Sequence, residues 1–98
     1  MKSIITAIII TAATATASLA QDAQDPCQSA GDLAQVIMER RQDGTPMSTL
    51  MNLIQGNEIA RLMIVEAYKV PRMAMPANQR REVEDFRNMM EMVCYNAG

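Results

Sequence analysis

Two cysteines near opposite ends of the chain constrain the fold most strongly. The sequence has 98 residues, and its only cysteines are Cys27 and Cys94. In small exported proteins an even pair of cysteines is typical of a disulfide. This bond would close a loop of about 68 residues and remove roughly 4 kcal/mol of unfolded-state entropy in the chain-entropy treatment. A redox-active or metal-binding thiol pair is disfavoured, because the chain has no Cys-x-x-Cys motif and no histidine.

The N-terminus has the pattern of an export signal. Lys2 precedes an apolar run over residues 4–10, and an Ala- and Thr-rich tract continues to Ala20. Small residues stand at the −3 and −1 positions of a cleavage site after Ala20. We predict a signal peptide over residues 1–20, a helical domain over residues 21–98 and a location in the periplasm or outside the cell. The alternative is an uncleaved anchor, but threonines dilute the apolar segment that would have to span a bilayer.

Helix start and stop signals divide the mature domain into segments. Asp25 before Pro26 is an N-cap followed by proline at the first helical position, and Gly44 is a good terminator. A short second segment starts after Pro46 and ends at Gly56. Apolar residues at helical spacing fill one side of both segments. The pattern therefore predicts two helices in the first half of the domain.

A third segment, residues 58–69, is apolar on almost every side, which is typical of a central helix. Pro71 ends it, and residues 70–76 form a connector. A long last helix follows, which we expect Asn78 to cap and which carries an apolar stripe that includes Phe86. No strand-like alternation of useful length is present. We predict an all-α fold: a small three- or four-helix bundle whose termini are joined by one disulfide.

The composition excludes several classes of function. The chain has no His and no Trp, and 3% of its residues are aromatic. The chain therefore lacks histidine, which is the commonest acid–base group and the commonest metal ligand. The aromatic side chains on which nucleobases stack are scarce. A net charge of −2 argues against generic nucleic-acid binding. Because no Ser/His or Cys/His nucleophile can be assembled, we expect a protein that is not an enzyme and has no cofactor.

Methionine is unusually frequent, with ten residues in the chain. Two clusters resemble the thioether sites that Cu(I) prefers in oxidising compartments: Met73 with Met75, and Met89 with Met90 and Met92. Packing explains these clusters without a metal, because methionine fills irregular gaps in small cores. No metal site is predicted, and a methionine-rich copper-handling protein stays an alternative.

Basic residues gather between the third segment and the last helix. No acid lies between Glu66 and Glu82, whereas half of the mature domain's basic side chains do. Apolar residues are interleaved with them, and this mixture suits docking on an acidic protein surface or an anionic headgroup. The plain alternative is a connector folded over the core with solvated basic flanks. The predicted partner-binding residues are Lys69, Val70, Pro71, Arg72, Met73, Met75, Arg80 and Arg81.

Short motifs along the mature chain resemble a loose class of small, uncharacterised exported bacterial proteins. The motifs are Ala34, Ile37, Arg40-Arg41-Gln42 with Gly44, Ala67-Tyr68 followed by a proline, Phe86 and Cys94. The resemblance covers most of the mature domain. It implies a helical fold clamped by a disulfide, and it implies no activity.

The sequence as a whole favours an exported, non-enzymatic helical binding protein. Its partner would be another macromolecule, acidic in character, and not a nucleic acid. An inhibitor or immunity-type protein acting in the periplasm is one concrete form, proposed by analogy. Besides copper handling, a structural envelope component or homo-oligomer that pairs through apolar helix surface stays open. No stable membrane span is expected once the leader is removed.

Overall fold

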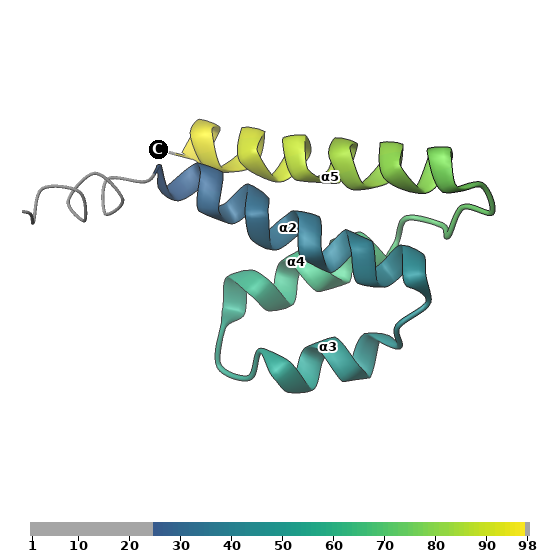
Figure 1. Cartoon of the computed structure of the whole chain (residues 1–98). Helices are drawn as coiled ribbons and strands as arrows, with labels where there is room; N and C mark the ends of the chain where they lie inside the picture. Colours follow the sequence, from purple (N-terminus) through teal and green to yellow (C-terminus); the bar gives the residue numbers. More distant parts are fainter. Residues whose placement is uncertain (1–24, 98) are drawn as a thin grey trace, which may run out of the picture.

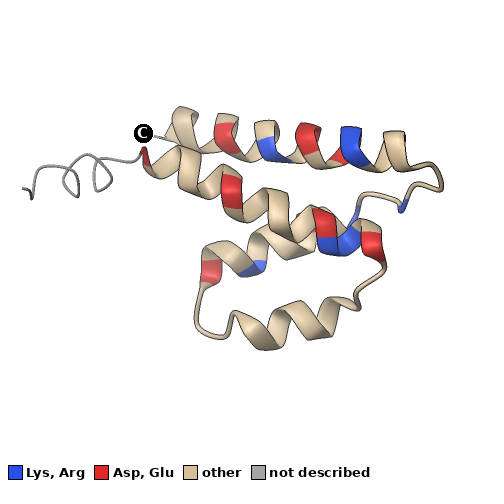
Figure 2. Ribbon diagram, viewed as in Figure 1, with Lys and Arg blue, Asp and Glu red and all other residues tan. Residues whose placement is uncertain are grey.

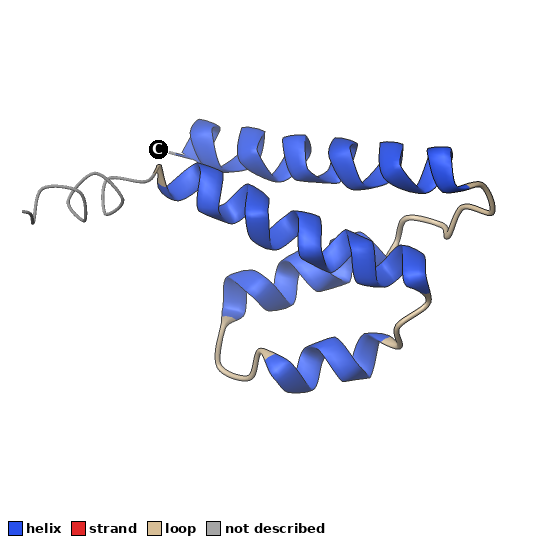
Figure 3. Cartoon of the chain, viewed as in Figure 1, coloured by secondary structure: helices blue, strands red, loops and turns tan. Residues whose placement is uncertain are grey.

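A computed structural model of the chain describes residues 25–97, which form four helices (Figure 1). They are α2 (Pro26–Asp43), α3 (Met47–Leu53), α4 (Glu58–Tyr68) and α5 (Pro76–Ala97). Turns and loops join them, and no strand occurs in this part of the chain (Figure 3). The predicted all-α fold is confirmed, with four helices between residues 25 and 97. The predicted signal peptide, residues 1–20, lies outside the described residues.

The central helix of the molecule is α2. It packs against α5 and against α4, whereas α3 packs on α4 (Figure 1). The prediction that residues 58–69 form the central helix holds only in part: α4 contacts both α2 and α3, but α2 makes the more extensive contacts. In α4 the side chains of Ile59 and Leu62 are 65% and 60% exposed. Helix α2 can serve two neighbours because buried residues recur along its whole length, from Cys27 to Gln42.

The apolar core is small and is formed by residues of α2, α3 and α4 together with Phe86 of α5. Its largest fully buried side chains are Met38 and Ile64. Among the residues of α5, all of which the structure describes, only Phe86 is buried. Val83 and Met90, which lie on either side of Phe86 along the helix, are partly buried against the same core. The buried cluster comprises Ala34, Ile37, Met38, Leu50, Met63, Ile64, Ala67 and Phe86.

Local signals placed most of the helix ends correctly. The side chain of Asp25 accepts a hydrogen bond from the backbone N–H of Cys27, which caps α2. Gly44 ends α2 with a left-handed φ of 90°, a conformation that glycine adopts without strain. Asn57 caps α4 by accepting from the N–H of Ala60 at 3.0 Å.

The start of α5 differs from the prediction. The helix begins at Pro76, and Asn78 lies inside it instead of capping it. The carbonyl of Met75 accepts from the backbone N–H groups of Asn78 and Gln79. Proline at the first helical position needs no N–H partner, so the chain enters the helix three residues earlier than an Asn78 cap would require.

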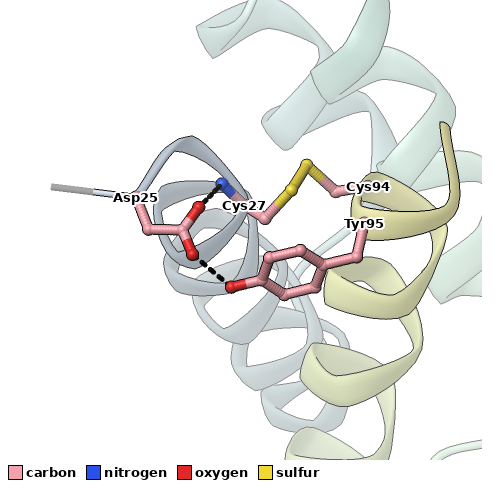
Figure 4. Close-up of a disulfide and its surroundings, with 4 residues drawn as sticks. All are labelled: Asp25, Cys27, Cys94 and Tyr95. Carbon is pink, nitrogen blue, oxygen red and sulfur yellow. Dashed lines mark hydrogen bonds between the residues drawn. A yellow bond between two sulfur atoms is a disulfide. The ribbon is translucent and has the colours of Figure 1, made fainter. Parts of the chain in front are cut away.

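A disulfide joins Cys27, in the first turn of α2, to Cys94, in the last turns of α5 (Figure 4). The two Cα atoms lie 5.4 Å apart, and neither cysteine is free. The predicted pairing is confirmed. The Tyr95 hydroxyl donates a hydrogen bond to the carboxylate of Asp25 beside it (Figure 4). The two ends of the described chain are thus joined by one covalent bond and one polar contact.

Candidate functional site

Two side chains at the C-terminal end of α2 hold the connector that leads to α5. The connector is defined here as residues 70–75. The guanidinium Nε of Arg41 donates to the carbonyl of Val70 at 2.9 Å. The side-chain amide of Gln42 donates to the carbonyl of Pro71 at 3.0 Å and accepts from the N–H of Met73 at 2.8 Å. Three backbone groups of the connector, in Val70, Pro71 and Met73, are therefore bonded to side chains of α2.

Gln42 is the one buried polar side chain in the described part of the chain, at 2% exposure. Its amide nitrogen also lies 3.6 Å from the sulfur of Met38. Burial of an amide is favourable only when its donors and acceptor have partners. Within residues 25–97, no buried side-chain nitrogen or oxygen lacks one. The connector backbone supplies the partners of Gln42, so the position of each depends on the other.

Arg72 lies across the end of α2. Its Nε donates to the carbonyl of Gln42 at 3.2 Å. A Cβ atom built on Gly44 would meet the Arg72 guanidinium carbon at 3.0 Å. Glycine is therefore favoured at position 44 for two reasons: the left-handed φ and the close approach of Arg72.

Tyr68 secures the turn that follows α2. Its hydroxyl donates to the carbonyl of Thr45, and the Arg41 guanidinium lies 5.0 Å from the centre of its ring. Burial raises the pKa of the Tyr68 hydroxyl, and the charge of Arg41 opposes that shift. The phenol therefore stays protonated and keeps donating at neutral pH. Arg41 thus links this turn and the connector in one polar cluster.

The residues predicted to bind a partner divide into two groups. Val70 and Met73 are partly buried against the domain, and Lys69 pairs with Glu66 at 2.8 Å. Pro71 is exposed but uses its carbonyl to receive Gln42. The remaining four side chains are exposed: Arg72, Met75, Arg80 and Arg81. We call these four residues the docking face.

Basic residues occur in the first turns of α5 (Figure 2). They are Arg80 and Arg81, and neither forms an ion pair within residues 25–97. Arg80 lines an open groove of about 510 Å³ between α2 and α5. Three acids line the same groove: Glu39, Asp43 and Glu84. The surroundings of Arg80 are therefore mixed in charge, which the linear sequence, with its acid-free stretch, did not reveal.

A second polar cluster sets the distance between α2 and α5. Arg87 contacts Asp32 at 2.8 Å, Glu91 at 3.1 Å and the side-chain oxygen of Gln35 at 2.8 Å. Its hydrogen bond with Asp32 is the largest of the causes that raise the pKa of Arg87 above its ordinary value. The side chain of Arg87 is 22% exposed, so these contacts are only partly screened by water. They fix how α5, and the docking face at its start, sits on α2.

The two methionine clusters lie at different places on the molecule. Met75 precedes the first residue of α5, whereas Met89 follows about four helical turns later, roughly 20 Å along the axis. Met90 packs against the core, whereas Met92 is 60% exposed. The structure therefore does not combine the two clusters into one thioether site. Among residues 25–97 there is also no group of three His, Cys, Asp or Glu side chains arranged to hold a metal ion.

Sequence reasoning missed the residues that order this site. Arg41 and Gln42 belong to a motif that was noted only as a resemblance, and Tyr68 to another. The sequence does contain one indication of this site: Gln42 lies one helical turn after Met38, on the apolar side of α2. A polar residue in such a stripe indicates a buried hydrogen-bonding partner elsewhere in the chain.

Comparison of the chain with protein-family models, with curated proteins and with solved structures finds no significant match. Between residues 25 and 97, no helix has both the length and the apolar character needed to cross a membrane.

Proposed function

We propose that the chain is an exported, non-enzymatic binding protein that contacts another macromolecule through the docking face. The observation that carries the proposal is the way Arg41 and Gln42 hold the connector backbone. A surface loop fixed by side chains from a neighbouring helix loses little conformational entropy when a partner binds. The side chains of Met75, Arg80 and Arg81 are left to solvent, whereas Arg72 is exposed and also donates to the carbonyl of Gln42.

The chemistry of the docking face favours an acidic protein partner. Three guanidinium groups and one exposed thioether combine bidentate donors with an adaptable apolar contact, and arginine is enriched at binding hot spots. Because acids share the groove with Arg80, we expect recognition through close contacts rather than through a broad positive field. An inhibitor or immunity-type protein that neutralises an enzyme or toxin in the periplasm is one form of this function.

Export is part of the proposal. A disulfide between Cys27 and Cys94 fits an oxidising compartment, and the apolar N-terminal stretch fits a cleaved leader. The intact mass of the native product should correspond to residues 21–98 with two hydrogens fewer than the reduced chain. A product that retains residues 1–20 and carries two free thiols would contradict export.

Charge reversal tests the docking face. The oxidised protein is used to capture a partner from envelope extracts, the partner is identified by mass spectrometry, and the purified pair is titrated. We expect the double variant Arg80→Glu, Arg81→Glu to weaken binding at least tenfold, because repulsion replaces two close contacts. Helicity should not change, since neither side chain has an ion pair to lose within the described residues.

A matched control carries the same change of charge elsewhere. Arg40, Gln28 and Asn88 are exposed, and Arg40 has only a solvent-exposed pair with Asp43 at 3.6 Å. The triple variant Arg40→Glu, Gln28→Glu, Asn88→Glu changes the net charge by the same amount and should bind within twofold of the wild type. Equal loss in the two variants would indicate an effect of net charge and would contradict the docking face.

A further inference from the structure

Helix α3 is the one helix within residues 25–97 that carries no charged side chain (Figure 2). The uncharged stretch is longer than the helix itself and covers residues 44–57. It is the longest uncharged stretch within residues 25–97. Polar but neutral residues, Ser48, Thr49 and Asn52, occupy the outer positions of α3.

The same helix exposes large apolar side chains. Leu53 is 77% exposed, the highest exposure among the large apolar residues of the described chain, and Met47 is 37% exposed. Only Leu50 of α3 is buried, and the helix packs on α4 alone to any extent. Single exposed apolar residues are ordinary, but here they stand on a surface from which charge is also missing.

A hollow lies at the turn from α3 to α4, directly after Leu53 in the chain. It has a volume of about 230 Å³, and Met51 and Ile54 contribute apolar walls. Gly56 also lines it, and a Cβ at that glycine would meet no atom within 4 Å. Its two charged lining residues, Glu58 and Arg61, have opposite signs. An exposed apolar side chain at the end of α3 is therefore followed at once in the chain by a partly apolar recess.

This combination fits a second copy of the same chain. In a two-fold dimer the same patch meets itself, so a charge on the patch lies near its own symmetry mate. Two copies of a net acidic protein repel each other. A two-fold contact avoids repulsion between like charges only where the surface carries no charge or equal numbers of positive and negative charges. The surface of α3 and the α3–α4 turn meets this condition.

We propose that the protein forms a two-fold homodimer through α3 and the α3–α4 turn, with Leu53 of each copy seated in the hollow of the other. Such a contact is isologous, because each copy contributes the same patch: its Leu53 side chain enters the partner's hollow while its own hollow receives the partner's Leu53. The docking face lies at the end of α2 and the start of α5, so it is separate from this contact. A dimer would thus present two docking faces to its partner.

Sedimentation of the oxidised protein at increasing concentration tests the dimer. We expect the weight-average mass to rise from one chain to two below about 1 mM, the weak limit of specific association. A single-chain mass throughout that range would overturn the proposal. The experiment is independent of the partner-binding proposal, because the variant Arg80→Glu, Arg81→Glu should dimerise like the wild type.

Paired substitutions locate the contact. Leu53→Lys places two like charges at the proposed interface, and the exposed position at the end of α3 should tolerate lysine. We expect this variant to dimerise at least tenfold more weakly than the wild type. The matched control is Met92→Lys, which changes a residue of 60% exposure on α5 and should leave the association unchanged.

A charge-swap experiment tests whether the two Leu53 positions meet across a two-fold contact. Leu53→Glu alone should also be monomeric, whereas an equimolar mixture with Leu53→Lys should form heterodimers, detected by native mass spectrometry. Failure of the mixture to associate would overturn the two-fold geometry. Equal weakening by Leu53→Lys and Met92→Lys, or a dimer that survives Leu53→Lys, would overturn the assignment to α3.

Discussion

One buried glutamine determines where the connector lies. Gln42 is the last residue but one of α2, yet its amide bonds to Pro71 and Met73, about thirty residues later in the chain. Arg41 and Arg72 reinforce the contact by binding backbone carbonyls from opposite directions. Side chains of one segment thus replace the regular secondary structure that the connector lacks, which is why its backbone can present a fixed surface.

Replacing Gln42 by leucine should destabilise the domain by about 1–3 kcal/mol, because the Pro71 carbonyl and the Met73 N–H lose their partner. Chemical denaturation measures the change. Gln55→Leu is the control, since Gln55 is exposed and its substitution should alter stability by less than about 0.5 kcal/mol. If both variants unfold at the wild-type midpoint, Gln42 does not hold the connector.

The pair formed by Asp25 and Tyr95 predicts a dependence of stability on pH. The hydrogen bond from Tyr95, and then that from the Cys27 N–H, lowers the pKa of Asp25 below 3.8. A carboxyl with a lowered folded-state pKa stabilises the fold above its unfolded-state value, and this contribution is lost as the pH falls through the folded-state value. Thermal melts should therefore show a decline in Tm below about pH 4.

Tyr95→Phe removes the larger cause of that shift and should make the decline in Tm shallower. The same bond raises the pKa of Tyr95, so the stabilisation it gives is present below pH 10 and is lost as the pH rises through the raised value. At neutral pH the variant should melt slightly below the wild type. If Tm falls equally steeply with decreasing pH in the variant and in the wild type, the contact between Tyr95 and Asp25 does not contribute to the acid dependence of stability.

At the scale of the elements, local signals and long-range contacts contributed differently to what could be predicted. Asp25, Gly44 and Asn57 act within one turn of chain, so their roles were evident from neighbouring residues. The central place of α2 could not be found this way, because it depends on which helices share its sides. Gly31 is an example. From the sequence alone a glycine within a helix is expected only to weaken the helix, whereas in the structure the missing Cβ leaves room for Glu91 of α5.

The substitution Gly31→Ala tests this close approach. Glycine to alanine in a helix ordinarily stabilises by about 0.5–1 kcal/mol. Here the new Cβ would lie 2.7 Å from the Cγ of Glu91, so that side chain must move and its contact with Arg87 is disturbed. We expect the substitution to destabilise the domain in denaturant unfolding.

The double variant Gly31→Ala, Glu91→Ala removes the obstacle and provides the control. Its stability should exceed the value obtained by adding the effects of the two single substitutions, because alanine at position 31 then keeps its helical advantage. Strict additivity of the three free energies would show that Gly31 and Glu91 do not meet.

For the molecule as a whole, the disulfide compensates for a modest core. Helix α5 buries Phe86 alone among its residues, and its last turns expose Met92, Val93 and Tyr95. Domains of this size bury only about 60% of the surface that their unfolded chains expose, and they commonly need a covalent brace. The two cysteines predicted that brace from sequence, whereas the polar cluster around Gln42 became visible only in three dimensions.

The central claim is that covalent closure of the two ends keeps α5, and with it the docking face, on α2. Denaturant unfolding of the oxidised protein and of the double variant Cys27→Ser, Cys94→Ser tests it most directly. We predict that the variant loses about 4 kcal/mol of the free energy of unfolding, because the bonded cysteines are separated by 67 residues in the sequence. A loss of that size is most of the stability of such a domain. Two proteins that unfold at the same denaturant concentration would contradict it.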